Sequence, residues 1–396
     1  MGPNPFLGVI FHWIGGFCSA TNFIPFRGIK RWSWEVYWPI QGFAAWIVAP
    51  SLLAALFVPG AYGLLRTAYA SNPRNLQYAF LFGLLWGVGG ITFGLAIRYL
   101  GIALGYAIAL GLSAFFGTLV PPVYHREMGS LLHSSSGRTI LAGVLICIVG
   151  VAVNGAAGYS KEQELTPEEM LEAGERDYDF GKGIAIAVLA GFMSSFFAFA
   201  LDAGKPLASL TRARLVAEGR MDLWANLPVL IVVLWGGFVT NLVWSAILIA
   251  QNGSVRQYVG QPGTNPMRAV PTAGNTLVDF DPLDPSTYDR LAPSTLFFNY
   301  VFAALAGVIW YFQFFFYSMG QTKMGKYDFS SWTLHMASII VFATLWGLVL
   351  KEWHGTSART KLLVSAGLLL LVASTVVVGY GNYIHAVRET VTAALR

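Results

Sequence analysis

Ten apolar stretches, each close to the length of a membrane-spanning helix, divide this sequence of 396 residues. They lie at about residues 6–25, 38–58, 78–97, 101–123, 139–157, 183–203, 227–250, 296–319, 329–350 and 362–383. A run of about 20 apolar residues crosses a hydrocarbon core as a helix, and these runs lack the alternation of barrel strands. Only 11% of the residues are charged, compared with roughly 25% in soluble domains. The sequence therefore predicts an all-α polytopic membrane protein with ten transmembrane helices.

The charged residues outside these stretches bear on orientation. Three basic residues at positions 27–31 follow the first stretch rather than precede it, so we do not expect a cleavable signal peptide. The first helix often dominates orientation, and this cluster favours both termini on the outer side. The remaining evidence is balanced, with 12 Lys and Arg residues on one side and 13 on the other. The segment TRARLVAEGR (211–220) favours the opposite orientation.

A sequence pattern recurs in the two halves of the chain. Residues 116–150 and 342–373 both begin with Phe-small-Thr-Leu, pass a basic-acidic pair and a polar loop, and reach Arg-Thr before another apolar helix. Chance similarity between apolar helices is the alternative explanation. Two copies of five helices each enter the membrane from opposite faces, which is the inverted-repeat arrangement of alternating-access transporters. We expect a first repeat at 1–157, an acidic polar linker at 158–182, and a second repeat at 183–396 with a long polar loop at about 251–293.

Polar side chains inside the expected spans are few, and they share helix faces. Such groups are costly in hydrocarbon and indicate function. Aromatic planes combined with a few fixed hydrogen-bonding groups are typical of a site for a neutral polar ligand such as a sugar. We therefore predict that the substrate is bound by Gln313, Tyr317, Trp310, Trp332, Ser331, Gln41 and Asn22.

Structural roles are the alternatives for several of these polar residues. Asp202 can form a local ion pair with Lys205 at a helix end, and His12 can reach the membrane interface. Gln313 and His335 can instead make hydrogen bonds between helices. The residues expected in the aromatic belt at the membrane interface are Trp32, Trp34, Trp38 and Trp353.

Five blocks of sequence carry a resemblance to a known family. They are KRWSWE (30–35), RYLG (98–101), WYFQFFFY (310–317), YDFSSWTLHM (327–336) and GLVLKEW (347–353). Together they resemble the L-rhamnose–proton symporter family of the drug/metabolite transporter superfamily, over nearly the whole chain. The resemblance implies ten helices in inverted repeats, proton-coupled uptake of a deoxy sugar and a bacterial inner membrane. It also implies that the fifth and tenth helices are peripheral. Only the 251–293 loop is longer than expected, which leaves room for a different substrate.

These observations favour a secondary active transporter that takes up a 6-deoxyhexose such as L-rhamnose with protons by alternating access. Without an ATP-binding motif, an ion gradient is the expected energy source. Histidine or a partly buried carboxylate suits a proton site, and the candidates are His335 with Asp328 on one helix face, followed by His12 and Asp202.

Other function classes fit the sequence less well. A transporter or exporter of another small polar solute is the main alternative. An intramembrane enzyme is disfavoured because the sequence has no nucleophile-base or metal-ligand pattern, and a receptor does not explain an inverted repeat lined with polar groups. Both cysteines, Cys18 and Cys147, fall within expected spans, so we expect no disulfide framework and no metal site, and no cofactor. The expected partners are the sugar, the proton and the lipid bilayer, with no nucleic acid.

Overall fold

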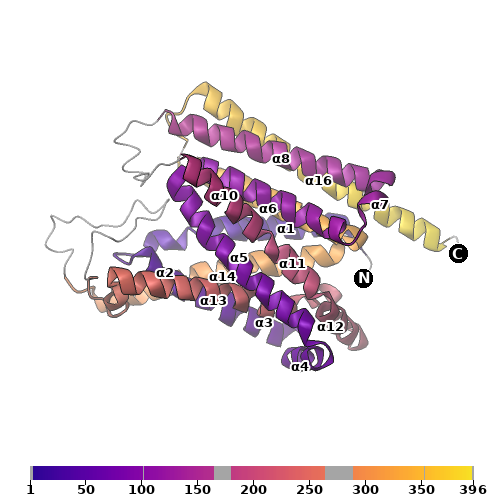
Figure 1. Ribbon diagram of the computed structural model, residues 1–396, viewed down its shortest axis with the longest axis horizontal. Coiled ribbons are helices and arrows are strands. Elements are labelled where there is room, and N and C mark those ends of the chain that lie inside the picture. Colours follow the sequence, from indigo (N-terminus) through magenta and orange to yellow (C-terminus); the bar gives the residue numbers. More distant parts are fainter. Residues whose placement is uncertain (1–2, 101, 165–179, 264–288, 352, 395–396) are drawn as a thin grey trace.

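The computed structural model describes residues 3–100, 102–164, 180–263, 289–351 and 353–394 (Figure 1). The helices up to the linker are α1 (Pro5–Thr21), η1 (Pro25–Gly28), α2 (Trp34–Gly42), η2 (Phe43–Val48), α3 (Ala49–Phe57), α4 (Ala61–Ser71), α5 (Pro73–Leu100), α6 (Ile102–Tyr124), α7 (Met128–His133) and α8 (Ser135–Glu162). Those that follow are α10 (Phe180–Ser194), α11 (Phe196–Ala203), α12 (Lys205–Ala217), η3 (Asp222–Trp224), α13 (Leu227–Asn252), η4 (Ser254–Val259), α14 (Pro293–Lys323), η7 (Gly325–Ser330), α15 (Ser331–Val349) and α16 (Ala358–Ala394).

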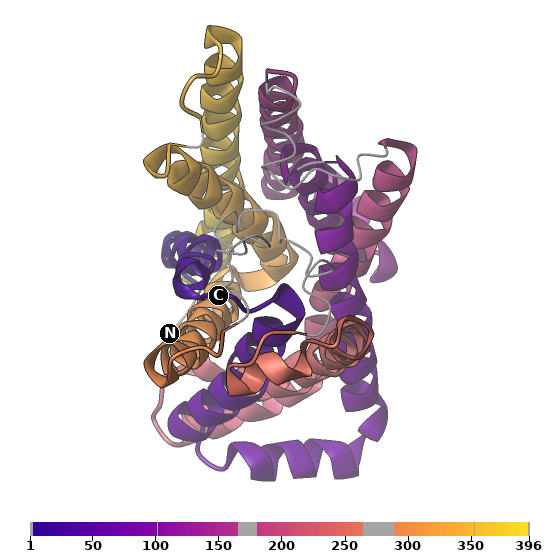
Figure 2. The same cartoon turned by 90° about the vertical axis from the view of Figure 1, so that its left-hand side faces the viewer.

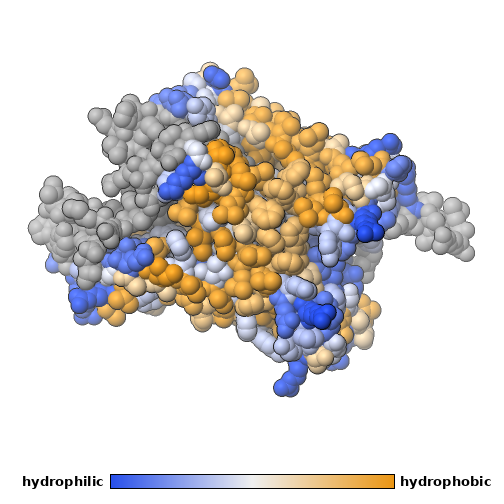
Figure 3. Space-filling view, in the orientation of Figure 1, coloured by the Kyte–Doolittle hydropathy of each residue, from blue (hydrophilic) through white to orange (hydrophobic). Residues whose placement is uncertain are grey.

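The apolar helices form a multi-pass membrane bundle. Within the described residues, nine segments are long and apolar enough to cross a membrane, and α6 carries a shorter apolar stretch, Ile108–Tyr124. On the face shown in Figure 3, hydrophobic residues form a band across the middle, with hydrophilic residues towards both ends. A helix satisfies its own backbone hydrogen bonds, which the hydrocarbon core cannot supply. The chain is therefore a helical, multi-pass membrane protein.

Helix packing places α1 and α5 at the centre of two groups. α1 packs between α14 and α15, and α5 packs between α10 and α13. α8 and α16 pack along each other at one edge of the bundle, as the resemblance implied for the fifth and tenth spans (Figure 1). The start of α1 and the end of α16 lie at the same end of the bundle.

Two of the spanning segments are interrupted within their length. α2 contains Pro39, which cannot donate a backbone hydrogen bond, and the chain continues through the π-helical turn η2 before α3. α10 ends at Ser194 and α11 begins at Phe196. π-helical turns within helices are frequent at functional sites, so the η2 turn lies where side chains for a site are expected.

In the described part of the chain, three short α-helices connect the spans and do not cross the bundle. They are α4, α7 and α12, and none was expected from the apolar pattern. Figure 2 shows α4 running across the lower edge of the bundle in that view. These helices contain fewer apolar residues than the spans, so a search for long apolar runs does not detect them.

The two polar connections of the sequence are partly described. α8 continues to Glu162 and α10 begins at Phe180, and residues 165–179 of the expected linker lie outside the described residues. The expected 251–293 loop opens with the 3-10 helix η4, and its residues 264–288 lie outside the described residues.

One residue expected in the aromatic belt is buried. Trp32 is 1% exposed, and its Nε1 donates to the carbonyl oxygen of Gln257 in η4 at 2.8 Å. The belt prediction for Trp32 is therefore wrong, because η4 covers the indole and supplies its hydrogen-bond acceptor.

Candidate functional site

Two histidines and a tyrosine meet at the centre of the bundle. The ring of His12 on α1 lies 5.3 Å from that of Tyr317 on α14 and 6.3 Å from that of His335 on α15, between centroids. Tyr317 and His335 lie 5.1 Å apart. We call these three residues the central triad. Both imidazoles are fully buried.

The imidazole nitrogens of the central triad have open hydrogen-bonding capacity. Nδ1 and Nε2 of both His12 and His335 are buried without a hydrogen-bond partner among the described residues. Buried polar groups in proteins are almost always paired, with protein, water or ligand. The central triad therefore has the chemistry to receive a proton, a water molecule or a hydroxylated ligand.

Glycines let the three helices approach closely enough to form the central triad. A Cβ on Gly320 of α14 would lie 2.8 Å from Nε2 of His12. A Cβ on Gly15 of α1 would lie 2.9 Å from the carbonyl oxygen of Gln313 and 3.3 Å from Cε1 of His335. Distances this short leave no room for a larger side chain without movement, so the glycines set the spacing of the imidazoles.

Trp332 forms an aromatic wall beside the central triad. Its ring lies 5.7 Å from that of Tyr317 and stacks on Phe197 of α11 at 5.4 Å. Its Nε1 donates to the carbonyl oxygen of Ser113 on α6 at 3.0 Å. A Cβ on Gly117 would lie 2.5 Å from that Nε1, so α6 fixes the indole through Ser113 and Gly117.

Two further predicted residues, Gln313 and Ser331, lie on the helices that carry the central triad. Gln313 is 4% exposed, and its Nε2 has no hydrogen-bond partner among the described residues. It lies one turn from Tyr317 on α14. Ser331 begins α15, one turn before His335, and its buried Oγ is likewise without a partner in the described part of the chain. Both side chains have capacity for ligand hydroxyls.

Trp310 belongs to a separate aromatic group. Its ring lies 5.2 Å from Trp46 of η2 and 5.8 Å from Trp86 of α5. Phe314 links this group to the central triad, with its ring 4.9 Å from Trp310 and 4.5 Å from Phe197. The residues predicted to form one wall on α14 are therefore divided between two groups.

Gln41 and Asn22 lie away from the central triad. Gln41 is fully buried on α2, both of its amide atoms lack a partner among the described residues, and its backbone packs against Gly307 of α14. Asn22 caps the end of α1 and donates to the carbonyl oxygen of Ser19. It is ten residues from His12, or about 15 Å along the helix at a rise of about 1.5 Å per residue.

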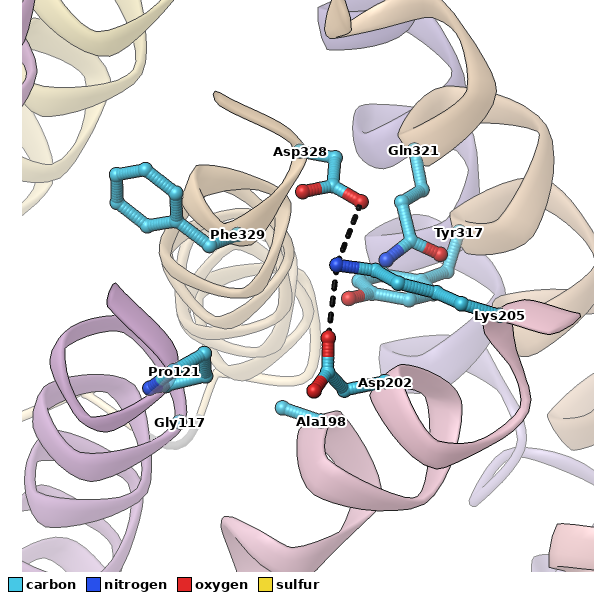
Figure 4. Close-up of a pocket in the computed structure, with 9 residues that line it drawn as sticks. All are labelled: Gly117, Pro121, Ala198, Asp202, Lys205, Tyr317, Gln321, Asp328 and Phe329. Carbon is cyan, nitrogen blue, oxygen red and sulfur yellow. Dashed lines mark ion pairs between the residues drawn. The ribbon is translucent and has the colours of Figure 1, made fainter. Parts of the chain in front are cut away.

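The two predicted carboxylates, Asp202 and Asp328, form a charged group at one end of the bundle. Nζ of Lys205 lies 2.7 Å from Oδ1 of Asp202 and 3.7 Å from Oδ2 of Asp328 (Figure 4). Nε2 of His125 at the end of α6 lies 2.8 Å from Oδ2 of Asp202. Burial lowers the pKa of Lys205, but the charges of Asp328 and Asp202 outweigh it and raise that pKa above its usual value.

The expected pairing of Asp328 with His335 stays a prediction, and the contact that the structure shows for Asp328 is with Lys205 of α12. Asp328 lies in η7, where Tyr327 has non-helical backbone angles, and α15 begins only at Ser331. The non-helical residue precedes Asp328, so it does not separate Asp328 from His335. The alternative of an ion pair between Asp202 and Lys205 is confirmed by their contact.

Sequence reasoning missed several residues that the fold brings to these groups. Phe197 has no polar or spacing signal that separates it from other span residues, and Ser113 is a single hydroxyl among several serines in the spans. Tyr311 adjoins the predicted Trp310, and its phenol oxygen is buried without a partner among the described residues. Only its position within the aromatic run WYFQFFFYSMG (310–320) could have indicated it.

Comparison with known proteins gives a consistent result over the chain. The profile of the L-rhamnose-proton symport protein family matches residues 1–260 and 285–383. L-rhamnose-proton symporters of Klebsiella pneumoniae (strain 342) and Cronobacter sakazakii (strain ATCC BAA-894) are each 32% identical over 378 residues, 95% of this chain and 97% of theirs. That of Escherichia coli is 32% identical over 376 residues with the same coverage. The matched residues include the central triad and the charged group.

Proposed function

Because this chain belongs to the L-rhamnose–proton symporter family, we propose that it takes up L-rhamnose together with protons by alternating access. It is a transporter and not an enzyme. The observation that carries the proposal, beside family membership, is the central triad, whose four imidazole nitrogens have no hydrogen-bond partner within the described residues. A buried site with open hydrogen-bonding groups suits a neutral sugar and a proton.

The packing of the helices supports the ten-helix inverted repeat. With α6 taken as the fourth span, each of the first five spans has a counterpart five spans later. When each span is replaced by its counterpart, the pair α1 and α14 becomes α10 and α5. The pair α1 and α15 becomes α10 and α6. The pair α8 and α16 is unchanged. All these pairs pack in the structure, as expected for two copies that are related by a pseudo-two-fold axis.

The proposed sugar ligands are Tyr317 of the central triad and three residues close to the triad. Gln313, Tyr317 and Ser331 supply an amide and hydroxyls, and Trp332 supplies an apolar plane for the C–H face of the ring. Trp310 and Gln41 are proposed to contact the sugar during its passage. They would do so on the side of Phe314 where the separate aromatic group of Trp310 lies. Asn22 was predicted as a ligand too, but its position at the end of α1 supports at most a contact outside the central triad.

Protonation of the central triad is the proposed coupling event. His335 and His12 can each exist in neutral and charged forms, and a sugar hydroxyl can donate to one form and accept from the other. Sugar binding and protonation are then linked, and such linkage is reciprocal. Asp328 and Asp202 were also candidates, but both already contact Lys205, whereas the imidazole nitrogens have no partner among the described residues, so the imidazoles come first.

The proposed location is the bacterial inner membrane, with both termini on the outer side. Bacterial relatives and the basic residues after α1 support this arrangement. Labelling of a cysteine introduced at Gly129 in intact cells tests it, because Gly129 lies in the exposed helix α7 at the end of the bundle that holds both termini. Labelling by an impermeant maleimide supports the orientation, and labelling only after lysis contradicts it.

Counterflow in proteoliposomes tests the transport function. Vesicles loaded with unlabelled L-rhamnose should take up labelled L-rhamnose transiently above its external concentration. Competition by other sugars and polar solutes distinguishes the substrate from the main alternative. Counterflow with another solute but none with L-rhamnose would replace the substrate and leave the transport class intact, and the absence of counterflow with any solute would contradict transport.

A further inference from the structure

A small pocket opens at the end of the bundle that carries the charged group. Five elements line it, namely α6, α11, α12, α14 and η7 (Figure 4). Lys205, Asp202 and Asp328 contribute their charged groups to it, and Gln321 contributes an amide. Their side chains also reach the surface, with 53% of Lys205, 22% of Asp202 and 27% of Asp328 exposed.

Tyr317 joins this pocket to the central triad. Its side chain lines the pocket and also contacts the rings of His12 and His335. Gln321 follows one turn later on the same face of α14. A ligand moving along α14 between the bundle end and the central triad would therefore meet Gln321 before Tyr317.

The polar groups of the pocket suit a pair of neighbouring hydroxyls. A carboxylate accepts hydrogen bonds, an ammonium donates them, and an amide does both, so a diol can bond to several groups at once. Small and apolar residues complete the lining: Gly117 and Pro121 lie across from Lys205, and Ala198 lies beside Asp202 on α11. The free space admits hydroxyl-sized groups rather than a whole sugar ring.

We propose that this pocket is an outer sugar subsite, which binds vicinal hydroxyls of a neutral monosaccharide before or after it occupies the central triad. The proposal rests on the proposed function, since it takes the transported sugar as the ligand. Lys205 is the central group, because its ammonium bridges the two carboxylates and can transfer one of its hydrogen bonds to a hydroxyl. A purely structural ion bridge is the competing explanation for the same contacts.

Protection of a pocket cysteine by L-rhamnose tests the subsite. The variant Ala198→Cys, with Cys18 and Cys147 replaced by Ser, is purified in detergent and labelled with the small thiol reagent methyl methanethiosulfonate. L-rhamnose should slow labelling several-fold. Gly129→Cys in the same background is the control, because Gly129 is exposed in α7 and does not line the pocket. Its labelling should not respond to sugar.

Second substitutions separate sugar contact from a conformational response. Lys205→Met should abolish protection, whereas Lys326→Met, an exposed lysine of η7 outside the pocket lining, should retain it. Gln313→Ala should weaken binding at the central triad but leave the sugar concentration needed for protection unchanged. The proposal would be overturned if Gln313→Ala raised the sugar concentration needed for protection as much as it weakened binding at the central triad. It would also be overturned if protection survived Lys205→Met.

Counterflow by the same proteins keeps this proposal separate from the proposed function. Intact L-rhamnose counterflow without any protection of Ala198→Cys would refute the outer subsite alone. Protection with the expected dependence on Lys205 would support it, and counterflow then reports independently on transport.

Discussion

At the scale of single residues, the central triad differs from an ordinary packed core in its unpaired groups. His12 and His335 are fully buried, yet their ring nitrogens have no partner among the described residues. Trp332, which lies beside them, has its indole nitrogen bonded to Ser113. The contrast separates residues whose polar atoms the protein itself satisfies from residues left open for a ligand.

Removing the amide of Gln313 should weaken sugar binding. Gln313→Ala is expected to cost about 1–3 kcal/mol of binding free energy, the usual cost of leaving a buried polar group unpaired. Tyr317→Phe should have a smaller effect in the same direction. Titration of purified protein with L-rhamnose measures both affinities, and normal affinity in a folded Gln313→Ala protein would rule out this role.

Sugar binding should change tryptophan fluorescence through Trp332. Its ring lies beside the central triad, so substrate-induced quenching should fall in Trp332→Phe. Trp310→Phe is the matched comparison, because Trp310 lies in the separate group beyond Phe314. Unchanged quenching in both variants would assign the two indoles to packing alone.

At the scale of helices, close contacts set the geometry of the site. α6 holds the indole of Trp332 at Gly117, where a Cβ would approach Nε1 to 2.5 Å. Such contacts are not visible as a motif in one sequence. They depend on which helices pack together, and each fixes a side chain that the apolar pattern alone could not place.

A methyl group at Gly117 should disturb Trp332 and therefore the sugar site. Overpacking of this kind typically costs about 1–3 kcal/mol, so Gly117→Ala should lower both thermal stability and L-rhamnose affinity. Gly90→Ala is the control, since a Cβ there meets nothing within 4 Å. Equal behaviour of the two variants in thermal unfolding and sugar titration would contradict the positioning role.

The sequence predicts the spanning elements better than it predicts their interruptions. Apolar run length is a property of each segment alone, and for this reason the expected 227–250 span agrees closely with α13 (Leu227–Asn252). The break before α15 depends on tertiary contacts instead. Helical spacing grouped Asp328 with His335 and gave no sign of the contact between Asp328 and Lys205 of α12, which depends on how α12 packs against η7.

The same limit applies to the site. Polar residues in apolar spans identified His12, His335 and Tyr317, because such residues are rare and costly there. Helix spacing could not show that Phe314 and Phe197 separate Trp310 from Tyr317. That separation arises from the packing of α11 against spans distant in the sequence.

At the scale of the whole molecule, contacts between the halves differ at the two ends of the bundle. At the α1–α2 connection, the backbone nitrogen of Lys30 donates to Oδ1 of Asn299 at 2.9 Å, and Nδ2 of Asn299 donates to the carbonyl oxygen of Lys30 at 2.8 Å. At the other end, the charged group borders the pocket. In the proposed alternating-access mechanism, the two ends of the bundle are closed by different contacts in any one state of the transporter.

Glu164 connects the end of α8 to the start of α16. Its Oε2 accepts from the backbone nitrogen of Ser357 at 2.7 Å, and its Oε1 accepts from Oγ1 of Thr360 at 2.6 Å. Hydrogen bonds from the side chain of Ser357, from Thr360 and from the backbone of Ser357 lower the pKa of Glu164 to about 2. The carboxylate is therefore the form that the folded protein stabilises.

The stabilisation by Glu164 should disappear in acid. Because the folded-state pKa lies below the unfolded one, the contribution is complete above the unfolded pKa of about 4.3. It is lost as the pH falls towards about 2. Thermal unfolding in detergent should show Glu164→Gln below wild type at pH 7, with the gap closing between about pH 4.3 and pH 2. A gap independent of pH would exclude the carboxylate as its cause.

Accumulation of labelled L-rhamnose in proteoliposomes under an imposed pH gradient tests the central claim most directly. Wild type should concentrate the sugar and lose this ability when a protonophore is added. His335→Gln keeps hydrogen bonding but cannot carry the proton, so it should exchange sugar in counterflow without accumulating it. His12→Gln and Asp328→Asn, measured alongside, locate the proton carrier if another group holds it. Accumulation that is driven by the pH gradient and intact in both His335→Gln and His12→Gln would contradict coupling through the central triad.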